Sequence, residues 1–327
     1  NATDMAIEMK QKGVLGKPCP DYVDETVSMK VVRIIQGYVN VVNKMVWRKE
    51  QRVVNEKTGR CLCWNCTESV FFFNVGGINI MNILVTGAKG MVGTALVNNL
   101  KNIRDGKNKT RLGIHIDEIF EYDLNSTEAE LDEYCAKADF VFNLAGVNRP
   151  ENPEDFMKGN FGFASQLLDT LKKHENKAGI MLSSSVQATL AGRFGNSEYG
   201  RSKKAGEEIF FDYGKETCAP VYVYRFVNLM GHSRPKYNSA ISTFCWAVAN
   251  DEEFTVNDRS TELEVLYIDD LVEGMFDLLE GKEQHCEFDG VETVLKSDGR
   301  YCCVPVTHKA TLGEIVDLLE QFKQQPI

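Results

Sequence analysis

The strongest constraint on the fold of this chain is a regular alternation of short apolar segments with longer amphipathic ones, from Met81 to Phe226. The longer segments run for about ten residues or more and have the periodicity of helices that bury one face. Helices joining successive strands predict a parallel sheet covered on both faces, and right-handed crossovers make this α/β sheet doubly wound. The expected strands are residues 82–86, 118–122, 139–144, 180–183 and 221–226.

The alternation loosens after Phe226, where loops containing Gly and Pro separate the predicted helices. We expect residues 81–226 to form a dinucleotide-binding core. Residues 227–327 are expected to form a smaller substrate-binding lobe that also returns elements to the core. The segments T-E-A-E from Thr127 and T-L-G-E from Thr311 are capping boxes, each predicting the start of a helix. Further helices are expected after the glycine loop near residue 90 and over residues 153–174, 199–213, 239–249 and 269–279.

Residues 1–80 do not follow this plan. An amphipathic stretch, residues 27–47, precedes a segment rich in Cys and Phe that has no clear periodicity. Cys61, Cys63 and Cys66 lack a fourth ligand at a familiar zinc spacing, so no metal site is predicted. A Gly-Gly pair can encode a ribosome-binding sequence shortly before Met81. We therefore expect translation to begin naturally at Met81 and residues 1–80 to be a fused or read-through extension.

Charge and cysteine content exclude several classes of function. A formal net charge of −10 opposes binding to nucleic acid or to an anionic membrane surface. No apolar run in the sequence reaches the roughly eighteen residues of a membrane-spanning helix. The 10 cysteines, with no secretory signal before them, are typical of reduced thiols. A cytoplasmic protein that acts on small molecules is expected.

A glycine-rich segment follows the first predicted strand and opens a helix, the position at which a dinucleotide pyrophosphate binds in such sheets. The candidate cofactor-binding residues are Gly87, Ala88, Lys89, Gly90, Met91, Val92 and Gly93. Lys89 favours NADPH, because its ammonium can pair with a 2′-phosphate. Asp123, after the second strand, favours NADH through a ribose 2′-hydroxyl. We expect NADPH, with NADH as the alternative.

The third and fourth predicted strands also end in residues suited to a cofactor site. Leu144, Ala145 and Gly146 form a turn expected beside the nicotinamide. Asn160 is expected either to orient the Lys203 region through hydrogen bonds or to cap a helix. Three serines, 183–185, close the fourth strand at its carboxyl end, where ligands bind in open parallel sheets.

Tyr199 and Lys203 lie four residues apart in Y-G-R-S-K and therefore on one face of a predicted helix. An ammonium there can lower the pKa of the phenol from about 10 toward neutrality. Tyr199 would give its proton to the alkoxide formed by hydride transfer, while Ser185 bonds the same oxygen and Lys203 holds the cofactor ribose. Ser185, Tyr199 and Lys203 are thus candidate catalytic residues of a carbonyl reductase, and the last two also bind cofactor.

The segments T-G-A-K-G-M-V-G, N-L-A-G-V-N-R-P, S-S-S-V-Q-A-T and Y-G-R-S-K resemble the extended short-chain dehydrogenase/reductases, the NAD-dependent epimerase/dehydratase family. The strings A-D-F-V-F-N-L-A-G-V-N-R-P, Y-N-S-A-I-S-T-F and V-T-H-K-A-T-L-G-E-I-V-D-L-L are similar to one branch, the CapF-type reductases. The resemblance implies a Rossmann-like fold and a place in the biosynthesis of N-acetyl-L-fucosamine for capsule or O-antigen. It also implies NADPH-dependent reduction of the C4 ketone of a UDP-2-acetamido-2,6-dideoxy-hexos-4-ulose.

The same resemblance implies partners. Members of this branch usually continue into a zinc-dependent cupin domain, which would begin near Ile327, so a separate cupin-type epimerase is an expected partner. Homodimers are common in the family and are a second expectation. Residues 1–50 resemble the tail of a UDP-N-acetylglucosamine 2-epimerase, which favours a fusion at that end.

Residues missing from family positions separate neighbouring activities. Val186-Gln187 stand where sugar-nucleotide 4,6-dehydratases carry Asp-Glu, and the cysteine of GDP-fucose-type epimerase-reductases is not beside the serine. A UDP-sugar 4-epimerase and a non-catalytic dinucleotide-sensing protein on the same fold stay open as alternatives. The candidate substrate-binding residues are Arg149, Ser184, Arg225, Asn228, Asn238 and Arg259.

Overall fold

The structure, a computed structural model, describes residues 80–148, 150, 152, 154–232 and 239–325. The expectations for residues 1–79, including the three clustered cysteines and the fused extension, lie outside the described residues, as do those for Arg149 and Asn238. Within the described part of the chain, no helix combines the length and the apolar character that crossing a membrane demands.

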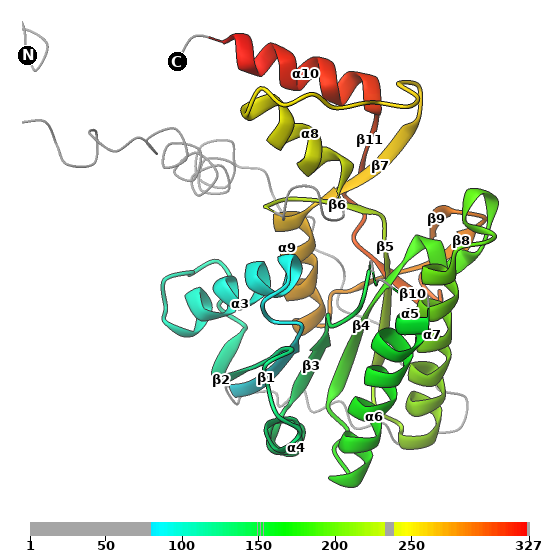
Figure 1. The fold of residues 1–327 in the computed structure, drawn as a ribbon. Helices are drawn as coiled ribbons and strands as arrows, with labels where there is room; N and C mark the ends of the chain where they lie inside the picture. The colour runs from blue at the N-terminus through cyan, green and yellow to red at the C-terminus, as the bar shows by residue number, and fades with distance from the viewer. Residues whose placement is uncertain (1–79, 149, 151, 153, 233–238, 326–327) are drawn as a thin grey trace, which may run out of the picture. The chain divides into compact units, whose positions relative to one another are not determined.

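An eight-stranded sheet in the described region has the order β2-β1-β3-β4-β5-β10-β8-β9 (Figure 1). The strands from β2 to β10 in this order run parallel, as predicted for the first five, and β8 and β9 continue the sheet antiparallel. Their bounds are β1 (Ile80–Thr86), β2 (His115–Tyr122), β3 (Phe140–Asn143), β4 (Gly179–Ser185), β5 (Val221–Phe226), β8 (Gln284–Asp289), β9 (Glu292–Leu295) and β10 (Tyr301–Cys303).

Helices cover both faces of this sheet because its strands bury side chains on both sides. Ile83 and Val85 of β1 enter one apolar cluster with α3 (Met91–Arg104) and α9 (Ile268–Leu279). Leu84 enters the other cluster, with the helices α4 (Glu128–Lys137), α6 (Phe163–Lys173) and α7 (Glu198–Thr217). The two-residue alternation of strand side chains therefore produces two cores, and the prediction of a doubly wound sheet is confirmed.

The predicted helix over residues 153–174 is helical but not uniform. It consists of α5 (Glu154–Phe156), the π-helical segment η2 (Met157–Gly162) and α6. A π-helical segment rotates the side chains that follow it, and such segments are frequent at functional sites. The capping boxes at Thr127 and Thr311 are both present, so those two helix starts are confirmed.

The chain after Phe226 divides between two structures. The strands β8, β9 and β10 and the helix α9 belong to the layers of the large sheet. The rest forms a three-stranded sheet of order β11-β7-β6, accompanied by two helices that contact each other. These elements are β6 (Asn228–Met230), β7 (Glu262–Tyr267), β11 (His308–Thr311), α8 (Ala240–Ala249) and α10 (Leu312–Gln324).

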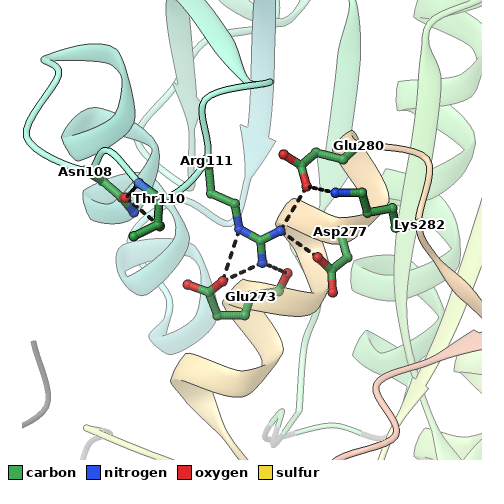
Figure 2. A network of polar contacts seen from close by, with 7 residues as sticks. All are labelled: Asn108, Thr110, Arg111, Glu273, Asp277, Glu280 and Lys282. Atoms are coloured by element: carbon green, nitrogen blue, oxygen red, sulfur yellow. Dashed lines mark hydrogen bonds and ion pairs between the residues drawn. The ribbon is translucent and has the colours of Figure 1, made fainter. Parts of the chain in front are cut away.

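Arg111 connects the segment between α3 and β2 to α9 through several acidic side chains (Figure 2). Its guanidinium donates to Glu273 at 2.5 Å, to Asp277 at 2.6 Å and to Glu280 at 3.0 Å. Lys282 bonds the same oxygen of Glu280 at 2.8 Å. A segment from the first half of the core is thus fixed to a helix that comes more than 150 residues later.

Candidate active site

The turn between β1 and α3 needs glycine at two positions. Gly87 has a positive φ of 69°, and a Cβ there would lie 2.7 Å from the backbone nitrogen of Ala145. A Cβ on Gly93 would lie 2.1 Å from the carbonyl oxygen of Gly87. The loop therefore folds tightly on the start of α3 and against the segment after β3. Within the described residues no side chain caps α3, whose N-cap is Gly90.

Asp123 lies beside this loop, at the end of β2. Its Oδ2 accepts a hydrogen bond from the backbone N–H of Lys89 at 2.7 Å, and its Oδ1 accepts one from Leu124 at 2.8 Å. Lys89, which favours NADPH, and Asp123, which favours NADH, are thus joined by a hydrogen bond. The donor is the Lys89 backbone N–H and not its ammonium. The carboxylate fixes the loop, and the Lys89 side chain is exposed.

Buried polar groups connect the ends of β1 and β3. The Thr86 hydroxyl donates to Asn143 Oδ1 at 2.7 Å and accepts from the Ala145 N–H at 3.3 Å. The Leu144 N–H donates to the Thr86 carbonyl at 3.2 Å. Residues 144–146 are held in this way against the glycine loop, on the side where the sequence places a cofactor.

Gly146 forms the connection from that turn to Lys203. A Cβ at Gly146 would lie 2.7 Å from Asn160 Oδ1 and 2.9 Å from Lys203 Nζ. Asn160 is buried in the π-helical segment, where Oδ1 accepts from the Val147 N–H at 2.9 Å and Nδ2 donates to Ser202 Oγ at 3.0 Å. The alternative of a helix cap at Asn160 is wrong, because the residue lies inside a helical segment. Its contacts are those of a residue that orients the lysine region.

The helix α7 presents Tyr199 and Lys203 on one face, as predicted. Lys203 Nζ lies 5.7 Å from the centroid of the Tyr199 ring and donates to the Ser183 carbonyl at 3.0 Å. The Tyr199 ring also contacts Phe156, whose ring centroid is 5.8 Å away. The lysine is 6% exposed, so its ammonium is enclosed by α7, the end of β4 and the Gly146 turn.

The expected effect of the ammonium on the phenol is not present in this arrangement. Burial raises the pKa of Tyr199 instead of lowering it, because removing water disfavours the phenolate. Burial also lowers the pKa of Lys203 to about 8, against the opposing influence of the Glu207 charge. The prediction of a tyrosine near neutrality is therefore corrected to one of a tyrosine that stays protonated and can act as a proton donor.

Ser185 ends β4 and begins the short 3-10 helix η3 (Val186–Thr189). Its Oγ accepts from the Gln187 N–H at 3.3 Å. A Cβ on Gly200 would lie 2.3 Å from the Gln187 carbonyl oxygen, so this glycine lets α7 approach η3 closely. The segments that carry Ser185 and Tyr199 are packed together by that contact.

Two candidate substrate ligands, Ser184 and Arg225, contact one buried carboxylate. Ser184 Oγ donates to Glu207 Oε1 at 2.5 Å, and Arg225 donates to both carboxylate oxygens at 2.8 and 2.6 Å. All three side chains are buried. Ser184 and Arg225 thus have an internal partner in Glu207, and their contact with a substrate stays a prediction.

Two further candidates belong to the small sheet and its neighbours. Asn228 donates to the Glu264 carbonyl at 2.9 Å, which ties β6 to β7. Arg259 donates to Asp317 of α10 at 2.5 Å and to the Gly313 carbonyl at 3.2 Å. The Arg259 side chain is 52% exposed, and Asn228 is also exposed. Both residues therefore remain accessible to a ligand.

Known proteins are similar to this chain in sequence and in fold. Residues 83–287 match the NAD dependent epimerase/dehydratase family. A UDP-2-acetamido-2,6-beta-L-arabino-hexul-4-ose reductase from Pseudomonas aeruginosa is 37% identical over 74% of this chain and 58% of its own length. The capsular polysaccharide assembling protein CapF from Staphylococcus aureus is 41% identical, with a TM-score of 0.60 over 75% of this chain and 59% of CapF.

This chain therefore spans somewhat over half the length of those two relatives. A UDP-glucuronic acid 4-epimerase from Bacillus cereus, solved with NAD, has a TM-score of 0.58 over 75% of this chain and 85% of its own. Its identity is only 19%, so that likeness concerns the fold alone.

Proposed function

Since the chain belongs to the NAD-dependent epimerase/dehydratase family, we propose that it is an oxidoreductase that reduces the C4 ketone of a UDP-2-acetamido-2,6-dideoxy-hexos-4-ulose. The observation that carries this proposal is the placement of Tyr199 and a buried Lys203 beside the Gly146 turn, at the carboxyl ends of β3 and β4. The name of the Pseudomonas aeruginosa relative supports the substrate class.

The residues between β1 and α3 fit a dinucleotide. A Cβ at Gly87 or Gly93 would clash with backbone atoms, so both positions require glycine. A loop of such small residues lets a pyrophosphate approach its backbone closely. The uncapped N-terminus of α3 offers N–H groups and partial positive charge to a pyrophosphate. When bound there, a reduced nicotinamide dinucleotide would supply hydride to the ketone carbon.

The chain's own residues would handle the proton and the developing charge. Tyr199, which burial keeps protonated, would donate its proton to the C4 oxygen. The Ser185 hydroxyl would donate a hydrogen bond to the same oxygen, and the Lys203 ammonium would hold the cofactor ribose and stabilise negative charge. Val186 and Gln187 offer no acid–base pair for elimination, which favours reduction over dehydration.

We propose NADPH as the preferred cofactor, with Lys89 available to a 2′-phosphate. The exposed Lys89 side chain leaves its ammonium free to move toward such a group. The Asp123 carboxylate is already bonded to two backbone N–H groups, which reduces its capacity to accept from a ribose hydroxyl.

We also propose two partners for this protein: a second copy of the chain, forming a homodimer, and a separate cupin-type epimerase.

The decisive experiment follows NADPH oxidation with a UDP-2-acetamido-2,6-dideoxy-4-keto sugar as substrate, using the full chain. We expect Tyr199→Phe to lower kcat by about 10²- to 10⁴-fold, because the proton donor is lost. NADPH affinity, measured by fluorescence titration, should change little. The same assay run with NADH should give a lower kcat/KM than with NADPH.

Tyr134→Phe is the matched control, since Tyr134 lies on α4 and stacks on Phe120 at 4.8 Å. It should turn over substrate at the wild-type rate. Equal turnover by Tyr199→Phe and wild type would refute the proposal. Interconversion of two UDP-sugars without net NADPH oxidation would identify a 4-epimerase instead.

A further inference from the structure

Glu207 is a carboxylate with no exposed surface, four residues after Lys203 on α7. Residues at this spacing lie on one face of a helix. A charged group is rarely buried to this degree without a partner, because losing its water is costly. The sequence motif Y-G-R-S-K ends before this residue, so the catalytic pattern does not include it.

Arg225 of β5 neutralises Glu207 with a two-pronged contact. Nε donates to Oε1 at 2.8 Å and Nη2 to Oε2 at 2.6 Å, while Nη2 also reaches the Tyr301 hydroxyl at 2.8 Å. The guanidinium lies 4.0 Å from the centroid of the Tyr301 ring and 5.1 Å from that of Phe288. The pair is therefore fixed in geometry by three strands of the sheet, β5, β8 and β10.

Adjacent residues of β4 bind the two buried charged side chains of α7. The Ser183 carbonyl accepts from Lys203 Nζ at 3.0 Å, and the Ser184 hydroxyl donates to Glu207 at 2.5 Å. Ser184 and Arg225 are also paired in the register of β4 and β5. One face of α7 is thus anchored to the strand that leads directly into Ser185.

A buried ion pair adds little to the free energy of unfolding, since well-packed apolar residues in its place often give equal stability. Its position beside Lys203 suggests another use. We propose that Glu207 is a positioning residue of this site, which holds the Lys203 end of α7 against β4. A carboxylate four residues from the lysine on the same helix face also favours the ammonium form. The inference extends the proposed function, because it depends on Lys203 serving the cofactor.

Charged and polar groups from several elements surround Lys203. Tyr199 and Glu207 face it from α7, Asn160 approaches from η2, the Ser183 carbonyl comes from β4, and Arg225 stands behind Glu207. Burial lowers the pKa of Lys203 to about 8, and the Glu207 charge is what opposes that shift. Without the carboxylate, the lysine should lose its proton at a lower pH.

The test compares wild type with Glu207→Gln in two measurements. The first titrates Lys203 directly through its ¹³Cε NMR signal in the ligand-free protein, assigned with Lys203→Met. The second follows NADPH binding by fluorescence between pH 6 and 10, where wild-type binding should weaken as pH rises through about 8. In Glu207→Gln both curves should move to lower pH by about one unit, a roughly tenfold loss of binding above that point.

Glu208→Gln is the matched control, since Glu208 is adjacent in sequence but pairs at the surface with Arg300. It should leave both curves in place. If Glu207→Gln does not fold, the double variant Glu207→Gln with Arg225→Gln removes both charges, and its Lys203 signal should still shift downward. An unchanged Lys203 titration in a folded variant lacking Glu207 would overturn the proposal.

The proposed function and the role of Glu207 can fail independently, and the experiments distinguish the two failures. A wild-type protein that does not reduce the keto sugar refutes that function, whereas the NMR titration needs neither substrate nor cofactor. A shifted Lys203 signal would then still support the role of Glu207.

Discussion

Arg225 and Arg111 each join segments that are distant in sequence, but they work in different surroundings. Arg225 is 7% exposed and its partner Glu207 is not exposed at all. Arg111 is 14% exposed and is bonded to three acidic side chains of α9 and its end, two of which are 44% exposed. Both arginines also lie over aromatic rings, Tyr301 for one and Phe276 for the other.

The difference shows how solvent decides what an ion pair can do. Water and salt screen the partners of Arg111, so its bonds hold a segment in place with a moderate effect on stability. The Glu207–Arg225 pair is shielded from both, so each charge depends on the other. Only the shielded pair lies next to Lys203, where an unscreened charge can change protonation.

The largest effect is expected for Arg225→Met, which leaves Glu207 buried without its partner. We expect the free energy of unfolding to fall by about 3–5 kcal/mol, measured by urea denaturation. Adding Glu207→Leu should recover most of that loss, because an apolar pair replaces the ionic one. A loss below about 1 kcal/mol for the single variant would mean that the pair is not shielded as described.

A smaller effect is expected for Arg111→Met. The variant should lose about 1–2 kcal/mol at low ionic strength, since charged hydrogen bonds to partly exposed carboxylates are lost. The loss should shrink in about 1 M NaCl, where the screening length is a few ångströms. The effect of Arg225→Met should not depend on salt in this way, and equal salt dependence would remove the distinction between the two networks.

The smallest effect is expected for Lys282→Met, at the edge of the Arg111 network. Lys282 is 65% exposed and bonds Glu280 at 2.8 Å. A surface pair of this kind should contribute less than about 0.5 kcal/mol to unfolding free energy. A thermal or urea denaturation curve indistinguishable from wild type is the expected result; a loss as large as that of Arg111→Met would show that the network acts as one unit.

Much of the fold could be predicted because its signals are local. Short-range periodicity or spacing predicts the first five strands, the capping boxes at Thr127 and Thr311, and the shared face of Tyr199 and Lys203. The returning strands β8 to β10 carry weaker patterns, and their place beside β5 depends on pairing between segments far apart. The π-helical segment that contains Asn160 has no comparable local signal.

The surroundings of individual side chains were harder to predict where burial decides them. Ser184 and Arg225 have the chemistry to bind a nucleotide-sugar, yet both are directed to Glu207. The pKa of Tyr199 was expected to fall because of a nearby ammonium, but desolvation raises it. Neither a buried partner nor the exclusion of water can be read from spacing along the chain.

The sequence by itself determined the alternation of the first five strands with helices, the glycine turn between β1 and α3, and the presence of Ser185, Tyr199 and Lys203. The glycine turn follows from the steric limits of single residues, and the strands and helices follow from their side-chain periodicity. Tertiary structure alone decided that Glu207 is buried, that Arg225 neutralises it, and that Gly146 leaves room for the lysine. Such contacts join residues from different parts of the chain, and the low dielectric that strengthens them exists only once the core has closed.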